Sequence, residues 1–385
     1  MIDSYLVLPA VIMWLTVLLL PWQPWRMRER FDLPTDWHSK QPSDRLAQVT
    51  VLIPARNETG LIATTLHGLA TQSASLEIII IDDQSTDGTA DQARETADKL
   101  GLESLHIITT PPLPGGWSGK LWALEQGRLH VNTKYVLMLD ADIEMMPGVL
   151  SALLTKLEDE ELHMLSLMVR LRMQNGWEKL LMPAFIYFFR LLYPFALSNR
   201  PNSRIAAAAG GCILLRADTL TAIGGFASLR GALIDDCSLA AKVKARGQRI
   251  WLGLTHAAVS QRRYECLGDI WQMITRTAYA QLRYSPALLL LCLLLLGLAF
   301  AAPLYGLTAG PPALWLALAA LIMMLASYAP TLRYYGISGW YMLTLPLAAI
   351  LFACMTVDSA RQHRTGRGNI WKDRVYVHEN PRDTD

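Results

Sequence analysis

Two aspartates, Asp140 and Asp142, stand one residue apart directly after the apolar run of residues 135–139. We interpret that run as a buried strand, and residues two apart on an extended backbone project to the same side. At the carboxyl end of a strand in an open α/β sheet, that side faces the ligand crevice. Two carboxylates there suit a hard divalent cation, which in turn binds a diphosphate. The pair therefore indicates a metal–diphosphate site, and its alternative is an ordinary strand that ends in a solvated turn.

Three further acidic features follow expected strands or lie in loops, where such a sheet holds its ligand. They are residues 54–58 (Pro-Ala-Arg-Asn-Glu), residues 82–89 (Asp-Asp-Gln-Ser-Thr-Asp-Gly-Thr) and the pair Asp235–Asp236, which comes after a glycine-rich stretch. Four acidic features at four such places are hard to ascribe to solvated turns, so we expect them to line one site.

The elements that must position these residues lie between about residue 48 and about residue 280. Strands are expected at residues 49–54, 77–81, 105–108 and 135–139, and helices at residues 58–69, 89–100 and 120–130. This alternation predicts a largely parallel sheet with right-handed crossovers. The second strand is continuously apolar, which is typical of a strand buried on both faces.

Several classes of protein are excluded. No GxGxxG loop follows the first expected strand, and Gly119–Lys120 has Pro114 and Leu121 where a P-loop needs glycine and Ser or Thr. These features argue against a dinucleotide dehydrogenase and a P-loop NTPase. The net charge is +2 and no arginine-rich stripe lies among aromatics, so we expect no nucleic-acid partner. The five cysteines show no CxxC spacing, which argues against a zinc site and fits a reducing compartment.

Long uncharged stretches predict that the chain enters a lipid bilayer. They cover residues 4–25, 284–332 and 334–357, in a chain of 385 residues that is 52% hydrophobic. A helix rises about 1.5 Å per residue, so each stretch can cross about 30 Å of hydrocarbon. The middle stretch is long enough for two crossings, divided at Gly310-Pro311-Pro312. We therefore expect a transmembrane helix at residues 1–25, a juxtamembrane linker at 26–47, a polar-rich domain at 48–285, about three transmembrane helices at 286–357 and a basic tail at 358–385.

Loop charge predicts the orientation in the membrane. Arg26, Arg28 and Arg30 follow the first apolar stretch, which places the large domain in the cytoplasm, on the inner (cytoplasmic) membrane. The basic residues before the second stretch agree: Arg262, Arg263, Arg276 and Arg283. Three later crossings would put the basic tail outside, while its own arginines favour the inside, so its side stays open.

In order, the four acidic features resemble the P-x-x-N-E, D-D-x-S-x-D, D-x-D and D-D motifs of inverting family 2 glycosyltransferases, over about residues 48–285. Residues 114–127 (Pro-Gly-Gly-Trp-Ser-Gly-Lys-Leu-Trp-Ala-Leu-Glu-Gln-Gly) look most like the hopene-associated members. The resemblance implies an α/β catalytic domain of the GT-A fold, Rossmann-like with a mostly parallel sheet. It also implies a nucleotide-diphospho-sugar donor, with a UDP-sugar expected.

The resemblance assigns the nucleotide end of the site to the first two motifs. Asp83 would accept a hydrogen bond from the base, and Pro54, Arg56 and Glu58 would line the nucleoside pocket. Asp87 precedes Gly-Thr-Ala at the start of an expected helix. Aspartate is a good N-cap residue, so we favour capping for Asp87 and binding for Asp83.

By the same resemblance, Asp142 would ligate Mg²⁺ or Mn²⁺, and Asp140 would contact the ribose, the metal or its water shell. Lys120 would add positive charge near the diphosphate, or it is a solvated lysine on a helix. Arg276 lies in Gln272-Met-Ile-Thr-Arg276, which is similar to the family's Q-x-x-R-W signature but longer and without the Trp. This difference argues for single sugar transfer, and Arg276 would reach the diphosphate or a lipid headgroup.

Asp236 is our candidate general base, because the acceptor hydroxyl must lose its proton as it attacks the anomeric carbon. The alternative is an acidic pair that complements a helix dipole. Residues 180–197 are apolar and aromatic, and we interpret them as an interfacial segment or a buried core helix. The expected activity is transfer of a single sugar, with inversion, to a lipid hydroxyl such as that of a hopanoid. The alternatives are transfer to polyprenyl phosphate and a non-catalytic nucleotide-sugar-binding membrane protein.

Overall fold

The computed structural model describes residues 2–33, 43–73, 76–365, 370–371 and 374–375. The chain divides into two compact units. The unit that we call the helical unit comprises Met1–Arg28, Met173–Ala196 and Tyr264–Asn369, and the sheet unit comprises Glu29–Arg172, Leu197–Arg263 and Ile370–Asp385. Residues 173–196 and 264–285, which we had grouped with the polar-rich domain, thus belong to the helical unit.

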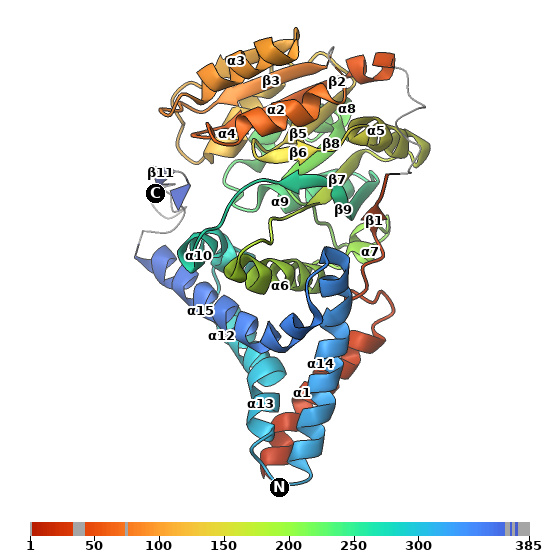
Figure 1. The fold of residues 1–385 in the computed structure, drawn as a ribbon, viewed down its shortest axis with the longest axis vertical. Helices are drawn as coiled ribbons and strands as arrows, with labels where there is room; N and C mark the ends of the chain where they lie inside the picture. The colour runs from red at the N-terminus through yellow and green to blue at the C-terminus, as the bar shows by residue number, and fades with distance from the viewer. Residues whose placement is uncertain (1, 34–42, 74–75, 366–369, 372–373, 376–385) are drawn as a thin grey trace. The chain divides into compact units, whose positions relative to one another are not determined.

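The sheet unit is built on one mixed, mostly parallel sheet (Figure 1). Its strands in spatial order are β1 (Arg30–Phe31), β9 (Ile250–Ser260), β7 (Met164–Arg170), β8 (Cys212–Arg216), β5 (Tyr135–Leu139), β2 (Val49–Ala55), β3 (Glu77–Asp82) and β4 (Leu105–Thr109), and β6 (Ile143–Met145) pairs with β9. The β5-β2-β3-β4 block is parallel throughout, as the alternation predicted. Strand β8 runs antiparallel to both β5 and β7.

Both faces of the sheet are covered, which explains the uninterrupted apolar strands. In β3, Ile78 and Ile80 belong to one hydrophobic core while Ile79 and Ile81 belong to the other. The first core is completed by α2 (Ile62–Ala70), α3 (Thr89–Leu100) and α5 (Val149–Asp159). The second is completed by α4 (Gly119–Arg128), α8 (Ala217–Ala222), η3 (Phe226–Leu229) and α9 (Asp235–Ala245). The expected α/β class is confirmed.

Local signals set the helix ends. Helix α3 spans the predicted residues and stops at Gly101, whose φ of +66° suits glycine. Helix α2 begins at Ile62, later than predicted, because a turn comes first in which the Glu58 carbonyl accepts from the N–H groups of Leu61 and Ile62. Four short elements also occur among the described residues: η2 (Ser43–Gln48), α7 (Phe195–Ser198), β10 (Ile370–Trp371) and β11 (Arg374–Val375).

Among its described residues, the helical unit has three stretches that are long and apolar enough to cross a membrane, judged by length and composition: Pro286–Gly306, Ala313–Tyr335 and Gly339–Arg364. They are built from α12 (Pro286–Leu296), η4 (Gly297–Ala301), α13 (Ala302–Gly306), α14 (Ala313–Tyr335), η5 (Gly339–Thr344) and α15 (Leu345–Arg364). The predicted break at residues 310–312 separates the first two stretches. The apolar α1 (Ile2–Leu19) is shorter, and its crossing of a membrane stays a prediction.

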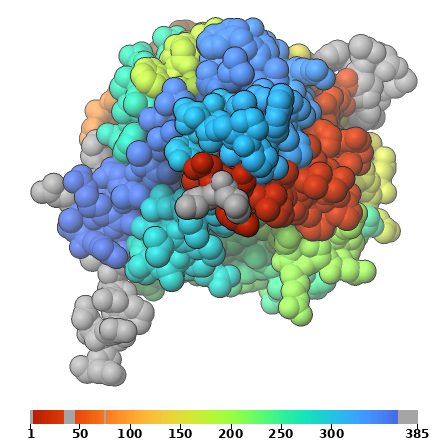
Figure 2. Space-filling view, turned by 90° about the horizontal axis from the view of Figure 1, so that it is seen from below, coloured from red at the N-terminus to blue at the C-terminus, as the bar shows by residue number. Residues whose placement is uncertain are grey.

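Helix α1 packs along α14 within this unit, as Figures 1 and 2 show. A Cβ atom on Gly306 would lie 2.8 Å from both the Ala317 Cβ and a Val7 methyl carbon. Small residues at such crossings let helix backbones approach closely. The Trp14 indole N–H donates to the Ala299 carbonyl over 2.9 Å, which links α1 to η4 as well.

Residues 176–192 form α6 (Gly176–Leu192), a helix of this unit in which nine of 17 residues are buried. Asn175 and Glu178 make a capping box at its start. Arg190 is 2% exposed and donates to the carbonyls of Pro24 and Arg26. The nine buried residues of α6 agree with a core helix, and Leu192, which is 58% exposed, agrees with an interfacial segment, so both interpretations of residues 180–197 stay predictions. The remaining helices of the unit are α10 (Leu267–Thr275) and α11 (Ala278–Gln281).

Candidate active site

Three of the predicted site residues, Lys120, Asp140 and Asp236, meet around Gly210. Ser118 caps α4 by accepting from the Leu121 N–H, which puts Lys120 in the first turn. The Lys120 Nζ lies 2.5 Å from Asp140 Oδ1 and donates to the Gly210 carbonyl over 3.2 Å. A Cβ on Gly210 would lie 3.2 Å from Asp236 Oδ2 and 3.3 Å from Lys120 Nζ. One glycine thus leaves the space in which these two side chains meet.

Asp236 lies in the first turn of α9, where its Oδ1 accepts from the Cys237 N–H over 2.7 Å. Burial and the neighbouring Asp235 carboxylate raise the pKa of Asp236 to about 7, although Cys237, Lys120 and Gly210 oppose the rise. A carboxyl group that titrates near neutral pH suits proton transfer. Asp236 itself accepts a hydrogen bond from an N–H group in the first turn of α9. The two interpretations, an acid that complements the helix dipole and a general base, therefore apply to the same residue.

The neighbouring carboxylates of Asp140, Asp235 and Asp236 stabilise the protonated, positively charged form of Lys120. Burial alone would lower the pKa of Lys120, but Asp140, Asp235 and Asp236 outweigh it and the pKa lies above its ordinary value. For Asp140, burial raises the pKa, and nearby Asp142 adds to the rise while Lys120 opposes it. The side chains of Lys120 and Asp140 are 23% and 33% exposed. Lys120 is therefore a charged, ion-paired member of the cluster rather than a solvated lysine.

Asp142 lies close to this cluster but has its own partners. The backbone turns after Asp140, whose carbonyl accepts from the Ile143 N–H over 3.1 Å, so our expectation of an extended backbone there was wrong. Asp142 is 8% exposed, and its Oδ2 accepts from the Ser260 hydroxyl over 2.5 Å. Arg262 Nη2 lies 3.5 Å from Asp142 Oδ1.

The residues predicted to hold the nucleotide lie at the ends of β2 and β3. Asp83 is 1% exposed, and its Oδ1 accepts from the Thr110 hydroxyl over 3.0 Å. Arg56 Nη1 donates to the carbonyl of Asp83 over 2.5 Å. Pro54 pairs with β3 beyond the last residue that pairs with β5, a position where the missing N–H of proline is tolerated. Glu58 is 7% exposed and accepts from Arg262 over 2.7 Å.

Asp87 binds the start of α3 from the position before the N-cap residue, which is Gly88 and not Asp87 as predicted. Its Oδ1 accepts from the Thr89 N–H and its Oδ2 from the Thr59 N–H, each over 3.0 Å. Burial is the largest single influence and raises the pKa of Asp87, but the hydrogen bonds from Thr89 and Thr59 together outweigh it and lower this pKa to about 2. Its side chain thus holds the loop after β2 against the start of α3.

Arg276 follows α10 in the helical unit, where its N–H donates to the Gln272 carbonyl over 3.2 Å. Its proposed contact with a diphosphate or a lipid headgroup stays a prediction.

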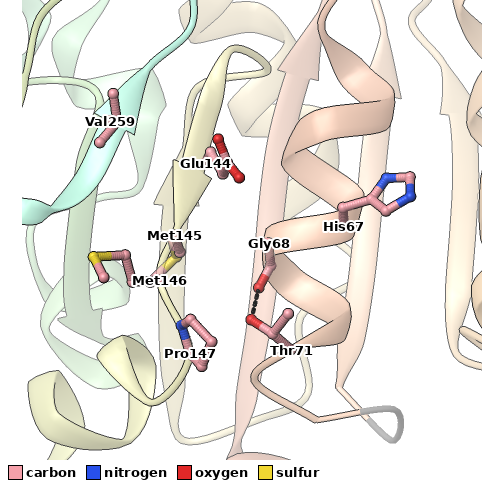
Figure 3. A pocket seen from close by; sticks show the side chains of 8 residues that line it. All are labelled: His67, Gly68, Thr71, Glu144, Met145, Met146, Pro147 and Val259. Atoms are coloured by element: carbon pink, nitrogen blue, oxygen red, sulfur yellow. Dashed lines mark hydrogen bonds between the residues drawn. The ribbon is translucent and has the colours of Figure 1, made fainter.

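A separate pocket of about 270 Å³ lies between α2 and β6 (Figure 3). It is lined by His67, Gly68, Thr71, Glu144, Met145, Met146, Pro147 and Val259. The Gly68 backbone packs tightly here, since a Cβ would lie 2.7 Å from the Met145 nitrogen. None of these lining residues is a predicted site residue.

The residues present fit Mg²⁺ or Mn²⁺ only as a site shared with a ligand. Among the described residues, no group of three His, Cys, Asp or Glu side chains could hold a metal ion. Asp140 and Asp142 would contribute one or two carboxylates. That number is typical of Mg²⁺ sites in which substrate phosphates and water complete the coordination.

The sequence did not predict Gly210 or Ser260 as site residues, nor the contacts of Arg262 with Glu58 and Asp142. Strand β6 pairs with β9 so that Ile143 faces Ser260, which brings Ser260 and Arg262 beside Asp142. These residues are more than a hundred positions apart in the chain, and the short β6 carries no strong strand pattern. Arg262 had been noted only as a charge near the membrane.

Residues 50–224 match the model of glycosyl transferase family 2. This range holds Asp83, Lys120, Asp140 and Asp142, and it ends before Asp236. Residues 50–224 are thus similar to glycosyl transferase family 2, and most of this range lies in the sheet unit. The more specific resemblance to hopene-associated members has no counterpart among the matches described below.

Two curated relatives are both 4,4'-diaponeurosporenoate glycosyltransferases. The one from Staphylococcus haemolyticus is 32% identical over 106 residues, which is 28% of this chain and 27% of the relative. The one from Staphylococcus aureus strain USA300 is 35% identical over 95 residues, or 25% of this chain and 24% of the relative. The matches thus span about a quarter of the length of these relatives.

Among solved structures, the mannosyltransferase PcManGT from Pyrobaculum calidifontis, in complex with GDP-Man and Mn²⁺, is similar with a TM-score of 0.54. The match covers 89% of this chain and 99% of that one at 23% identity. This likeness confirms the expected GT-A fold.

Proposed function

We propose that this protein is a membrane-bound, metal-dependent, inverting glycosyltransferase that moves a single sugar from a nucleotide-diphospho-sugar to a lipid. The meeting of Lys120, Asp140 and Asp236 around Gly210 carries the proposal. Gathering partly buried carboxylates raises their pKa values, and such perturbed groups cluster at functional sites. The family 2 match over residues 50–224 supports the reaction class.

In this proposal, Asp83, Pro54, Arg56 and Glu58 bind the nucleoside, and Asp140 and Asp142 hold Mg²⁺ or Mn²⁺. The bound cation would neutralise charge that develops on the departing diphosphate. Lys120 supplies a fixed positive charge beside Asp140 for the same purpose. Arg276 is proposed to contact the diphosphate.

Asp236 is proposed to accept the proton of the acceptor hydroxyl as the oxygen attacks the anomeric carbon. One in-line displacement breaks the bond to the diphosphate and inverts the configuration at that carbon. The pKa of about 7 leaves a large fraction of Asp236 ionised at neutral pH, so it can serve as the base.

A lipid acceptor is supported by the three apolar stretches and by the name of the relatives, 4,4'-diaponeurosporenoate glycosyltransferase. A hopanoid hydroxyl is the acceptor that we propose, with catalysis on the cytoplasmic side of the inner membrane. The donor is a UDP-sugar in our proposal, while the solved neighbour holds GDP-Man, so both nucleotides belong in the test.

An acceptor that is already ionised is the second candidate. Polyprenyl phosphate is one such acceptor, and the relatives' name specifies a carboxylate. Such an oxygen needs no base, so substitution of Asp236 would leave transfer largely intact.

The test incubates membranes that contain the protein with radiolabelled UDP- and GDP-sugars, followed by mass spectrometry of labelled lipids. Membranes from cells without the protein are the control. One lipid that gains the mass of a single sugar is expected. A non-catalytic protein would label no lipid and, after purification, would not hydrolyse any nucleotide-sugar in the presence of Mn²⁺.

A further inference from the structure

The guanidinium of Arg262 contacts two carboxylates, those of Glu58 and Asp142. In the proposed function Glu58 binds the nucleoside and Asp142 holds the cation. Arg262 Nη2 lies 2.7 Å from Glu58 Oε1 and 3.5 Å from Asp142 Oδ1. The side chains of Glu58 and Asp142 are 7% and 10% exposed, while that of Arg262 is 33% exposed. Ionised carboxylates that are this buried are costly unless a positive charge is near them.

The backbone around Arg262 is fixed to Asp142. The Gln261 N–H donates to the Asp142 carbonyl over 2.8 Å. The Ser260 hydroxyl donates to Asp142 Oδ2 and accepts from the Arg262 N–H over 3.3 Å. The backbone from which the Arg262 side chain extends is therefore held beside Asp142, directly after the end of β9.

The two contacts of the guanidinium differ in strength. The distance to Glu58 is that of a charge-assisted hydrogen bond, whereas 3.5 Å to Asp142 is an electrostatic contact at the limit of hydrogen bonding. Arg262 can therefore give up Asp142 and stay anchored on Glu58.

We propose that Arg262 is an exchangeable counter-ion that neutralises Asp142 until the donor and its cation arrive. A divalent cation at Asp142 and the guanidinium repel each other, so binding of the cation alone is opposed. A nucleotide diphosphate offers the displaced guanidinium new negative charge, and cation and nucleotide then bind cooperatively. This inference rests on the proposed function, because it takes Asp142 as a cation ligand.

The test measures Mn²⁺ binding to the full chain in detergent by electron paramagnetic resonance. It uses MnCl₂ alone and MnCl₂ with UDP or with GDP. Arg262→Gln is expected to bind Mn²⁺ alone about tenfold more tightly than the wild type, because a positive charge next to the ligand is gone. The factor by which nucleotide tightens Mn²⁺ binding is expected to shrink similarly, since the two effects are linked.

Arg263→Gln is the matched control, since it removes one positive charge at the next position, and it is expected to change Mn²⁺ affinity by less than about twofold. Glu58→Gln is the second variant. It removes the anchor and leaves the guanidinium to Asp142, so Mn²⁺ alone should bind more weakly, by about threefold. A general loss of structure would weaken Mn²⁺ binding with and without nucleotide, whereas the counter-ion role predicts that the factor by which nucleotide tightens Mn²⁺ binding grows in Glu58→Gln. That factor decides the matter if Arg262→Gln does not fold.

Unchanged Mn²⁺ affinity in Arg262→Gln, or equal tightening in Arg263→Gln, would overturn the role of Arg262 while the proposed function stands. Altered Mn²⁺ affinity in a protein that transfers no sugar would overturn the proposed function and keep the counter-ion role. Absence of Mn²⁺ binding in every variant would overturn both.

Discussion

At the scale of single residues, substitution of Asp236 tests whether the acceptor is a hydroxyl, because a hydroxyl needs a general base and an ionised acceptor does not. Asp236→Asn keeps the size of the side chain and removes its basicity. We predict a loss of turnover of at least about a hundredfold, the usual contribution of a general base, with nucleotide binding retained. Steady-state transfer and equilibrium binding of the donor nucleotide measure the two properties. Transfer close to the wild-type rate would instead favour an acceptor that is already ionised.

The pH dependence of the reaction follows from the same group. Because burial and Asp235 raise the pKa of Asp236 to about 7, the side chain is protonated and inactive as a base at lower pH. We predict that kcat/KM falls about tenfold per pH unit below that value, as it does for a free enzyme with one essential base. In Asp235→Asn the like charge is gone, so the fall should move to lower pH. A profile that is flat between pH 5 and pH 8 would exclude Asp236 as the base.

At the scale of elements, Gly210 in the segment before β8 lies beside Lys120 of α4 and Asp236 of α9. Gly210→Ala places a methyl group 3.2 Å from Asp236 Oδ2 and 3.3 Å from Lys120 Nζ, closer than ordinary packing. We predict a loss of activity of about tenfold to a hundredfold, because small displacements of reacting groups are costly. Gly211→Ala is the matched control, since its methyl would be 3.4 Å from its nearest neighbour, a Val169 methyl carbon. Equal activity of the two variants would contradict the assignment of Gly210.

The start of α3 gives a prediction about stability. The pKa of Asp87 is lowered to about 2, so its hydrogen bonds to Thr89 and Thr59 stabilise the fold above the unfolded-state pKa of 3.8. This contribution is lost as the pH falls through about 2. Asp87→Ala should therefore lower the free energy of unfolding by about 1 kcal/mol at pH 7, the usual value for such a cap.

Asp87 is exposed to solvent, which screens its interactions and keeps the effect of Asp87→Ala near that modest value. Thermal unfolding in detergent at pH 7, 5 and 3 measures the difference from the wild type, which should shrink toward low pH. A difference that grows as the pH falls would contradict the capping role. Asp83→Asn is the comparison variant, because we expect this substitution to weaken binding of the donor nucleotide, whereas we expect Asp87→Ala to lower the free energy of unfolding.

The order of elements and the candidate site were predictable to different degrees. The strands from residue 49 to residue 139 follow local apolar patterns, and the structure has them in the predicted parallel block. The contact of Asp87 with the start of α3 was predictable because Thr89 lies two positions away, whereas its contact with Thr59, 28 positions earlier, was not. The roles of Arg262 and Gly210 were not predictable, because they depend on the β6–β9 register and on the approach of Gly210 to Lys120 and Asp236, which no local spacing encodes.

At the scale of the whole molecule, the sheet unit supplies polar chemistry and the helical unit supplies apolar surface. Three stretches of the helical unit are long and apolar enough to cross a membrane. The proposed function needs both units, because the donor is soluble in water and the acceptor is a lipid. The reaction therefore has to be measured with the full chain in lipid or detergent.

The most direct test of a cation-dependent sugar-transfer site is transfer by the purified full chain with Mn²⁺, with EDTA, and with the variant Asp142→Asn. We predict one labelled lipid product with Mn²⁺, none with EDTA, recovery when Mn²⁺ is restored, and a loss of at least about a hundredfold in Asp142→Asn. Transfer at an equal rate in EDTA and in the variant would contradict the central claim.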